Sequence, residues 1–179
     1  MDEFDIDHLL KMSNSIVKNY AIPGLNSSLI GGNGRGTVRL FECSREHMEP
    51  IIPHSHRFDF QCLVLAGSVK NIIWNKTNKF DSDLFMISEL NFGGDFGKFE
   101  ETEISTCKFY PDEKEYFEGD FYSMKSRDIH SIFFSRGAKV LMFEGPSISN
   151  SSVILQPYVD NKTVPTFRVD KWMFERIAP

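Results

Sequence analysis

The sequence predicts an all-β fold, an antiparallel β-sandwich or barrel, and three observations support this prediction. Short runs rich in β-branched and aromatic residues recur along the chain, with turn-forming residues between them. The 17 phenylalanines beside 12 glycines and 8 prolines favour strands and turns over a helical bundle. A chain of 179 residues with 41% apolar content is expected to fold as one domain with a sizeable core.

A short N-terminal helix is expected before the strands. Apolar side chains recur at helical spacing across residues 4–19, and Pro23 and Gly24 end that pattern. The glycine-rich run 31–36 has no Gly-Lys-Ser/Thr after it, so a turn is favoured over a phosphate-binding loop. Residues 1–36 are therefore interpreted as a helix and a glycine-rich lead-in.

Strands dominate the rest of the chain. Residues 37–146 are expected to form the barrel, and the stretch 75–114 within it is long enough for an inserted hairpin. Residues 147–179 are expected to add a strand and an aromatic tail that packs on the barrel or on a second subunit. A turn is expected at Tyr110-Pro111-Asp112. The predicted strands are Thr37–Cys43, Gln61–Ala66, Val69–Trp74, Leu84–Leu90, Glu103–Phe109, Glu115–Glu118, Asp120–Met124, Ser131–Phe134, Ala138–Glu144 and Ser152–Gln156.

Charge and cysteine content restrict the partners and the compartment. A net charge of −5 argues against a general nucleic-acid binder, which needs a basic face. No apolar stretch approaches the roughly 18–20 residues that span a bilayer, and the acidic start of the chain does not resemble a signal peptide. Three widely spaced cysteines are typical of reduced thiols. We therefore expect a cytoplasmic protein with no nucleic-acid or membrane partner.

Two histidines at a spacing of two residues are the first candidates for chemistry. His54 and His56 precede an apolar run that ends at Gly67, and in an extended segment both side chains project to one face. Two imidazoles on one face can share a metal ion. A third histidine, His130, lies in a later segment. The alternatives are a solvent-exposed pair after Pro53 and a hydrogen-bonded core histidine at position 130.

The two histidine segments resemble the two motifs of the cupins. The first motif reads Gly-x5-His-x-His-x3,4-Glu-x6-Gly, and His54, His56 and Gly67 lie at its positions. The second motif reads Gly-x5-Pro-x-Gly-x2-His-x3-Asn, and Gly119 and His130 fit its spacing. The resemblance implies a cupin-like jelly roll in which the three histidines bind one metal ion.

The chain also departs from these motifs. The motif glutamate is replaced by Gln61 or Phe60, depending on the count, and Lys125 and Arg127 replace the proline and glycine of the second motif. The resemblance, which covers roughly residues 37–146, then implies a three-histidine site with Gln61 as an optional fourth ligand. Three neutral imidazoles leave open positions on the ion for a substrate and dioxygen or water.

Among cupins, three histidines without the glutamate are similar to the thiol dioxygenases, which use Fe(II) to oxidise a small thiol to its sulfinate. This resemblance implies that Cys62 lies near the metal beside a tyrosine, either Tyr158 or Tyr122. It also implies that Arg39 holds a substrate carboxylate through a bidentate pair. The alternatives are a buried, inert Cys62 and an ordinary strand-surface Arg39.

The sequence therefore predicts a mononuclear non-haem iron dioxygenase that uses dioxygen and a small molecule such as a thiol. Phe58, Phe60 and Cys62 share the inward parity of the two histidines and would line an apolar substrate pocket. One alternative is a Zn, Ni or Mn isomerase or lyase acting on a sugar or keto acid, and another is a non-catalytic cupin binding module. A homodimer is expected by resemblance.

Overall fold

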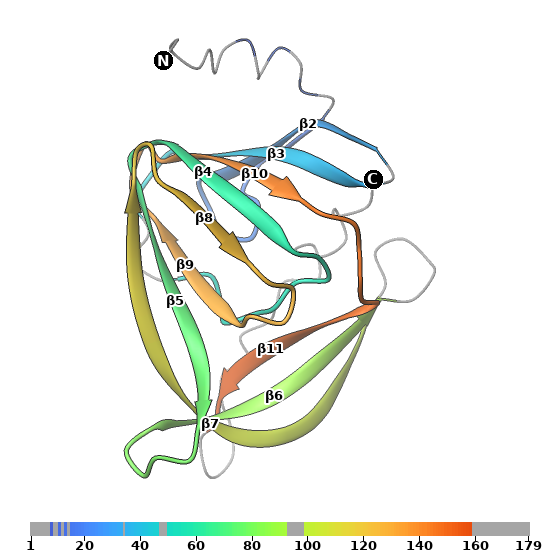
Figure 1. Ribbon diagram of the computed structural model, residues 1–179, viewed down its shortest axis with the longest axis vertical. Helices are drawn as coiled ribbons and strands as arrows, with labels where there is room; N and C mark the ends of the chain where they lie inside the picture. The colour runs from blue at the N-terminus through green and yellow to red at the C-terminus, as the bar shows by residue number, and fades with distance from the viewer. Residues whose placement is uncertain are drawn as a thin grey trace.

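The computed structural model describes residues 8, 11, 13, 15–33, 35–46, 50–92 and 99–158 and confirms the all-β, cupin-like fold (Figure 1). The strands are β1 (Ser15–Val17), β2 (Leu25–Asn33), β3 (Gly36–Cys43), β4 (Phe60–Ala66), β5 (Ser68–Thr77), β6 (Asp83–Phe92), β7 (Phe99–Phe117), β8 (Phe121–Met124), β9 (His130–Phe134), β10 (Lys139–Glu144) and β11 (Ser151–Pro157).

The strands of the described residues form two antiparallel sheets. One has the order β1-β2-β3-β10-β4-β8 and the other the order β11-β6-β7-β5-β9. Alternate side chains of both sheets point into a shared core, which includes Phe41, Val64, Val69 and Val140. A cavity lies against this core, and Phe41 and Val140 belong to both.

The N-terminal part differs from its prediction. His8 and Lys11 are helical, but Ser15–Val17 pairs with β2 as a strand, so the expected helix does not continue to residue 19. The glycine-rich run is not one long turn, because its first residues extend β2 and Gly36 begins β3. Local spacing could not show this, since β1 and β2 are held by pairing along the sheet rather than by their own propensities.

Strand β7 is a single strand of 19 residues where the sequence predicted two strands and a turn at Pro111. It pairs with β6 as far as Phe109 and with β5 from Lys108 onward. Figure 1 shows it curving from the β5 side of the molecule to the β6 side. At Pro111 the strand therefore has one neighbour instead of two, and a missing N–H is tolerated at such an edge.

A short segment around His54 forms backbone hydrogen bonds with both edge strands of the five-stranded sheet. His54 pairs as an isolated bridge with His130 of β9 on one side and with Ile154 of β11 on the other. His54 and His130 exchange two backbone hydrogen bonds of 2.9 Å. Beside them, the Leu155 amide donates to the Pro53 carbonyl and the Ser55 amide to that of Val153. The two edge strands are thus joined through residues 53–55.

The expected aromatic tail beyond Tyr158 lies outside the described residues. The part of the chain that the structure describes contains no helix long and apolar enough to span a membrane.

Gly67, in the turn between β4 and β5, offers a test of this packing. Its φ is +69°, and an added Cβ would lie 2.9 Å from the Ala138 Cα. Gly119 has a φ of +89° but open space around the same position. We expect Gly119→Ala to lower the free energy of unfolding by about 1 kcal/mol through backbone strain. Gly67→Ala should lower it by about 2–4 kcal/mol, because the clash adds to the strain.

Urea denaturation of the two variants measures this difference. Equal losses in both would show that the turn accommodates a Cβ and that the contact with the β9–β10 turn does not restrict position 67.

Candidate metal centre

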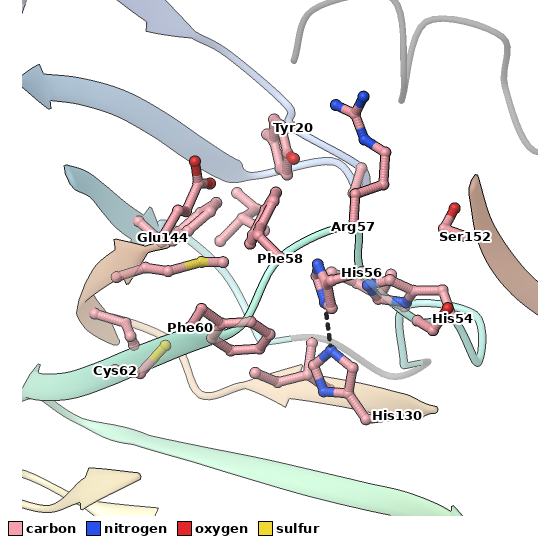
Figure 2. A pocket seen from close by; sticks show the side chains of 18 of the residues that line it. Tyr20, His54, His56, Arg57, Phe58, Phe60, Cys62, His130, Glu144 and Ser152 are labelled. Carbon is pink, nitrogen blue, oxygen red and sulfur yellow. Dashed lines mark hydrogen bonds between the residues drawn. The ribbon is translucent and has the colours of Figure 1, made fainter. Parts of the chain in front are cut away.

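The three histidines predicted as ligands meet at one end of the cavity (Figure 2). His54 and His56 come from the loop before β4, and His130 is the first residue of β9. One nitrogen of each ring lies within 4.8 Å of the others, and the Nε2 atoms of His56 and His130 are 2.9 Å apart. Ligand nitrogens that share an ion at bonds of 2.0–2.1 Å lie roughly 3 Å apart. The His56–His130 pair therefore has the spacing of two ligands of one ion.

Hydrogen bonds fix the orientation of two of these rings. The His54 Nδ1 donates to the Ile52 carbonyl at 2.7 Å, and the His130 Nδ1 donates to the Asn71 Oδ1 at 2.9 Å. Each bond places the proton on Nδ1, and the lone pair of Nε2 is then free to bind a metal. His54 and His130 therefore each present a free Nε2 that a divalent ion can bind.

The surroundings keep the three rings neutral. Burial lowers the pKa of His54 and lowers the pKa values of His56 and His130 well below the usual range. The proximity of the rings adds to the effect, because His54 opposes a positive charge on either neighbour. Neutral imidazole is the form that binds metal ions, so the site does not need to release protons from these rings at neutral pH.

The cavity beside the histidines is small and largely apolar. Its free volume is about 110 Å³, space for roughly four water molecules at about 30 Å³ each. The sequence predicted that three residues after the histidines would point to the same side as the histidines. Phe58, Phe60 and Cys62 all line the cavity, and the rings of His56 and Phe60 lie 4.6 Å apart.

Cys62 lies beside Tyr122, which is one of the two tyrosines that the sequence left open. The two residues are directly opposite on β4 and β8, and both line the cavity. Burial raises the pKa of the Cys62 thiol to about 12, and a hydrogen bond with the Tyr122 hydroxyl only partly opposes this shift. Cys62 is therefore a neutral thiol at physiological pH. Tyr158, the other of the two tyrosines, is 43% exposed and is not among the residues that line the cavity.

Two further predicted residues have different surroundings from those expected. Gln61 is exposed on the opposite face of β4 from Phe60 and Cys62, so it is not a fourth ligand. Arg39 is buried, not on the strand surface, but its Nε donates to the Glu144 Oε1 at 3.0 Å. This guanidinium is therefore already paired with a carboxylate and is not the substrate-binding group that the resemblance implied.

Sequence reasoning missed several polar residues of the site. Asn71 is only 1% exposed and lies in a strand whose other inward residues are apolar, which is a detectable signal for a buried partner. Arg57 follows His56 directly and also lines the cavity. Glu144 and Ser152 complete the polar lining, but they come from β10 and β11, and no local pattern connects them to the histidines.

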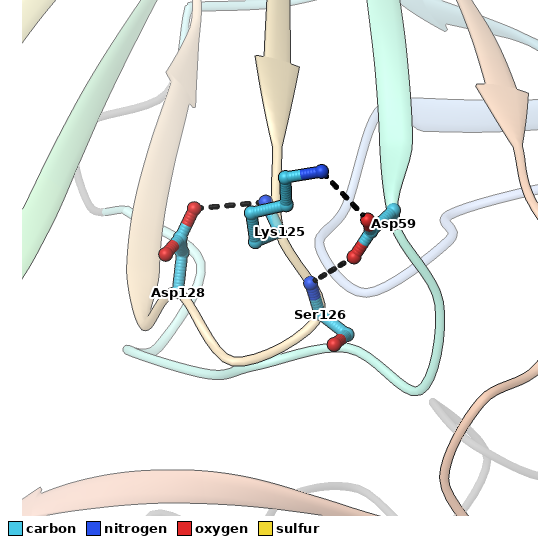
Figure 3. Close-up of polar contacts among 4 residues, drawn as sticks. All are labelled: Asp59, Lys125, Ser126 and Asp128. Carbon is cyan, nitrogen blue, oxygen red and sulfur yellow. Dashed lines mark hydrogen bonds and ion pairs between the residues drawn. The ribbon is translucent and has the colours of Figure 1, made fainter.

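A polar clasp formed by Asp59, Lys125 and Ser126 holds the loops that carry His56 and His130 (Figure 3). The Asp59 Oδ2 accepts a hydrogen bond from the Lys125 Nζ at 2.9 Å, and its Oδ1 accepts one from the Ser126 amide at 2.8 Å. The His56 amide donates to the Ser126 carbonyl at 2.9 Å. Lys125, which replaces the motif proline, thus has a local structural contact.

The fold and the histidine group together define a cupin-like β-sandwich with a candidate metal centre. No family model and no curated protein matches the sequence. Similar solved structures include hydroxypropylphosphonic acid epoxidase from S. wedmorenis, at 10% identity and a TM-score of 0.46, covering 73% of this chain and 54% of that chain. This chain thus spans about half the length of the epoxidase.

Two smaller proteins are also similar in structure. A cupin superfamily protein from Desulfitobacterium hafniense has 13% identity and a TM-score of 0.39, covering 75% of this chain and 80% of that chain. KdgF from Halomonas sp. has 12% identity and a TM-score of 0.39, covering 69% of this chain and 82% of that chain.

Asn71 provides a test of the candidate centre that leaves the three histidines in place. Because its side chain orients His130, we expect Asn71→Ala to weaken Zn²⁺ or Fe²⁺ binding about 10- to 100-fold. Asn75→Ala is the matched control, since Asn75 lies in the same strand and donates only to the Ile73 carbonyl. Competition with a chelator measures the affinity, and circular dichroism confirms folding. An unchanged affinity in folded Asn71→Ala would contradict the orienting role.

The Asp59 carboxylate of the clasp predicts that the stability of the fold depends on pH. Hydrogen bonds from Lys125 and Ser126 lower the pKa of Asp59, so the ionised carboxylate stabilises the fold above its unfolded pKa, near 3.9. This contribution is lost as the pH falls through the lower folded-state pKa. Asp59→Asn should therefore be less stable than the wild type at neutral pH, and the difference should disappear in acid.

Urea denaturation at a series of pH values measures this difference, with Asp81→Asn as the control for removal of an exposed carboxylate. A gap that remains constant into strong acid would show that Asp59 acts through packing instead of its charge.

Proposed function

We propose that this protein is a metal-dependent enzyme, a mononuclear non-haem iron dioxygenase that oxidises a small molecule. The observation that carries the proposal is the convergence of three neutral imidazoles on one end of a largely apolar cavity. Fe(II) is the proposed metal, since three nitrogen ligands leave positions open for both a substrate and dioxygen.

When bound, the iron would supply a centre that activates dioxygen beside the substrate. The chain's own residues hold and shield that centre. Ile52 and Asn71 keep two imidazoles in the ligating tautomer, and the rings of Phe58 and Phe60 limit the access of water. The protonated Cys62 thiol adds no charge to the centre.

We propose a small thiol as the substrate. Support comes from the pairing of Cys62 with Tyr122 in the cavity wall, which matches the cysteine and tyrosine that the resemblance to thiol dioxygenases implies. Tyr122, which faces Cys62 across the sheet, takes the place of the exposed Tyr158 in this proposal.

The test combines metal content with oxygen uptake. Protein loaded with Fe²⁺ without air is exposed to oxygen together with a panel of thiols and keto acids. Thiol-dependent oxygen uptake with a sulfinate product supports the proposal. Bound metal without oxygen uptake across the panel favours the isomerase or lyase alternative, with Zn, Ni or Mn. A cavity that cannot be loaded with any of these metals favours a non-catalytic binding module.

Replacing His130 tests the metal site directly. His130→Ala should lose most bound metal and all metal-dependent oxygen uptake, because one of three ligands is removed. His8→Ala serves as the control, since His8 is exposed and outside the histidine group. Metal analysis of both variants checks this expectation. Full metal occupancy in a folded His130→Ala protein would mean that His130 is not a ligand.

A further inference from the structure

One short segment of the cavity wall belongs to neither sheet. Tyr20 and Ala21 line the cavity but lie in the connection between β1 and β2 (Figure 2). Every other described residue of the lining belongs to a strand or to the segment 51–58, which is hydrogen-bonded to β9 and β11. We call residues 19–24 the flap. Its first and fifth residues are exposed, so it faces solvent on one side and the cavity on the other.

The hydrogen bonds of the flap are mostly internal. The Tyr20 amide donates to the carbonyl of Leu25, the first residue of β2, at 2.6 Å. The Asn19 Oδ1 accepts a hydrogen bond from the Gly24 amide at 2.8 Å. Among the described residues, no hydrogen bond joins residues 20–22 to any residue outside 20–25. The flap can therefore turn about its junction with β2 as one unit.

Three hydrogen bonds from the segment after β3 hold the flap in place, and we call them the latch. The Gly24 carbonyl accepts bonds from the amide and the hydroxyl of Ser44, at 2.8 and 3.0 Å. The Arg45 Nε donates to the Pro23 carbonyl at 2.8 Å. The Arg45 side chain also lies against the flap backbone, since a Cβ added at Gly24 would be 2.7 Å from the Arg45 Cγ. The latch therefore acts on the last two residues of the flap, beyond those that line the cavity.

The closed position of the flap carries backbone strain that other contacts must offset. Asn19 and Ala21 have φ angles of 54° and 61°, in the left-handed region that is unfavourable for a residue such as alanine. The Tyr20 ring packs on Phe41 with 5.5 Å between the ring centres, and burial raises the pKa of its hydroxyl to about 12. Strain of this kind persists only where surrounding contacts enforce it. Loss of the latch or of the aromatic contact therefore favours an open flap.

We propose that the flap controls access to the cavity and that Tyr20 limits the size of the molecules that enter. The latch and the Tyr20 ring hold the flap closed, and a ligand enters when the flap opens. A movable cover suits a site that must exclude water during a reaction and still admit a substrate. The proposal goes beyond the proposed function, because the route of access does not depend on which metal or reaction the site uses.

Cys62 offers a reporter of access, because it is 3% exposed and lines the cavity. The full chain is treated with methyl methanethiosulfonate or its bulkier benzyl analogue, and peptide mass spectrometry follows the modification of each cysteine. Arg45→Ala should raise the rate of Cys62 modification about fivefold or more, since it removes a charge-assisted hydrogen bond of the closed flap. Tyr20→Ala should raise the rate more for the benzyl reagent than for the methyl reagent.

Arg136→Ala is the matched control, because Arg136 is an exposed arginine in the nearby β9–β10 turn. A series of low urea concentrations separates flap opening from global unfolding, because local opening exposes little surface and depends only weakly on urea. Unchanged Cys62 rates in folded Arg45→Ala and Tyr20→Ala, or a wild-type rate that rises steeply with urea, would overturn the proposal. Equal acceleration of both reagents in Tyr20→Ala would overturn the size limit.

Discussion

The backbone of His54 connects the two edges of the five-stranded sheet, and the candidate site depends on this connection. Its amide and carbonyl pair with His130, and its neighbours Pro53 and Ser55 pair with β11. The two imidazoles, which are far apart in the sequence, therefore lie side by side because of main-chain hydrogen bonds. The backbone thus brings two of the three candidate ligands together.

Neutral and charged groups are separated within the cavity. Desolvation keeps the histidines neutral at one end, while the buried pair of Arg39 and Glu144 lies on the paired interior strands β3 and β10. Removing one partner of such a pair is costly, because the other charge remains buried. The pair therefore has a structural explanation that does not involve a ligand.

Sequence reasoning predicted the features that follow from local periodicity and motif spacing. The alternation of side chains along the segment that leads into β4 placed Phe58, Phe60 and Cys62 on the cavity wall. The prediction for Gln61 failed for a local reason. Gln61 has the right position in the motif. Because successive side chains of a strand point to opposite faces, Gln61 points away from the cavity while Phe60 and Cys62 point into it.

The other failures arise where the environment of a side chain depends on a distant strand. Neither the partner of Arg39 on β10 nor the choice between Tyr122 and Tyr158 is encoded near those residues. Each is settled by strand register, which pairs Cys62 with Tyr122 and leaves Tyr158 at the end of β11. Strand β7 can likewise continue through Pro111 because its pairing with β6 ends at Phe109 and β5 is its neighbour at Pro111.

The lack of a carboxylate in the histidine group and the unpaired Arg57 have the same electrostatic consequence. Three neutral imidazoles leave a divalent ion with its full double charge, and Arg57 adds another positive charge to the same small cavity. Like charges in a space of low dielectric repel, so a ligand that supplies negative charge would bind a metal-loaded cavity more tightly than a neutral one.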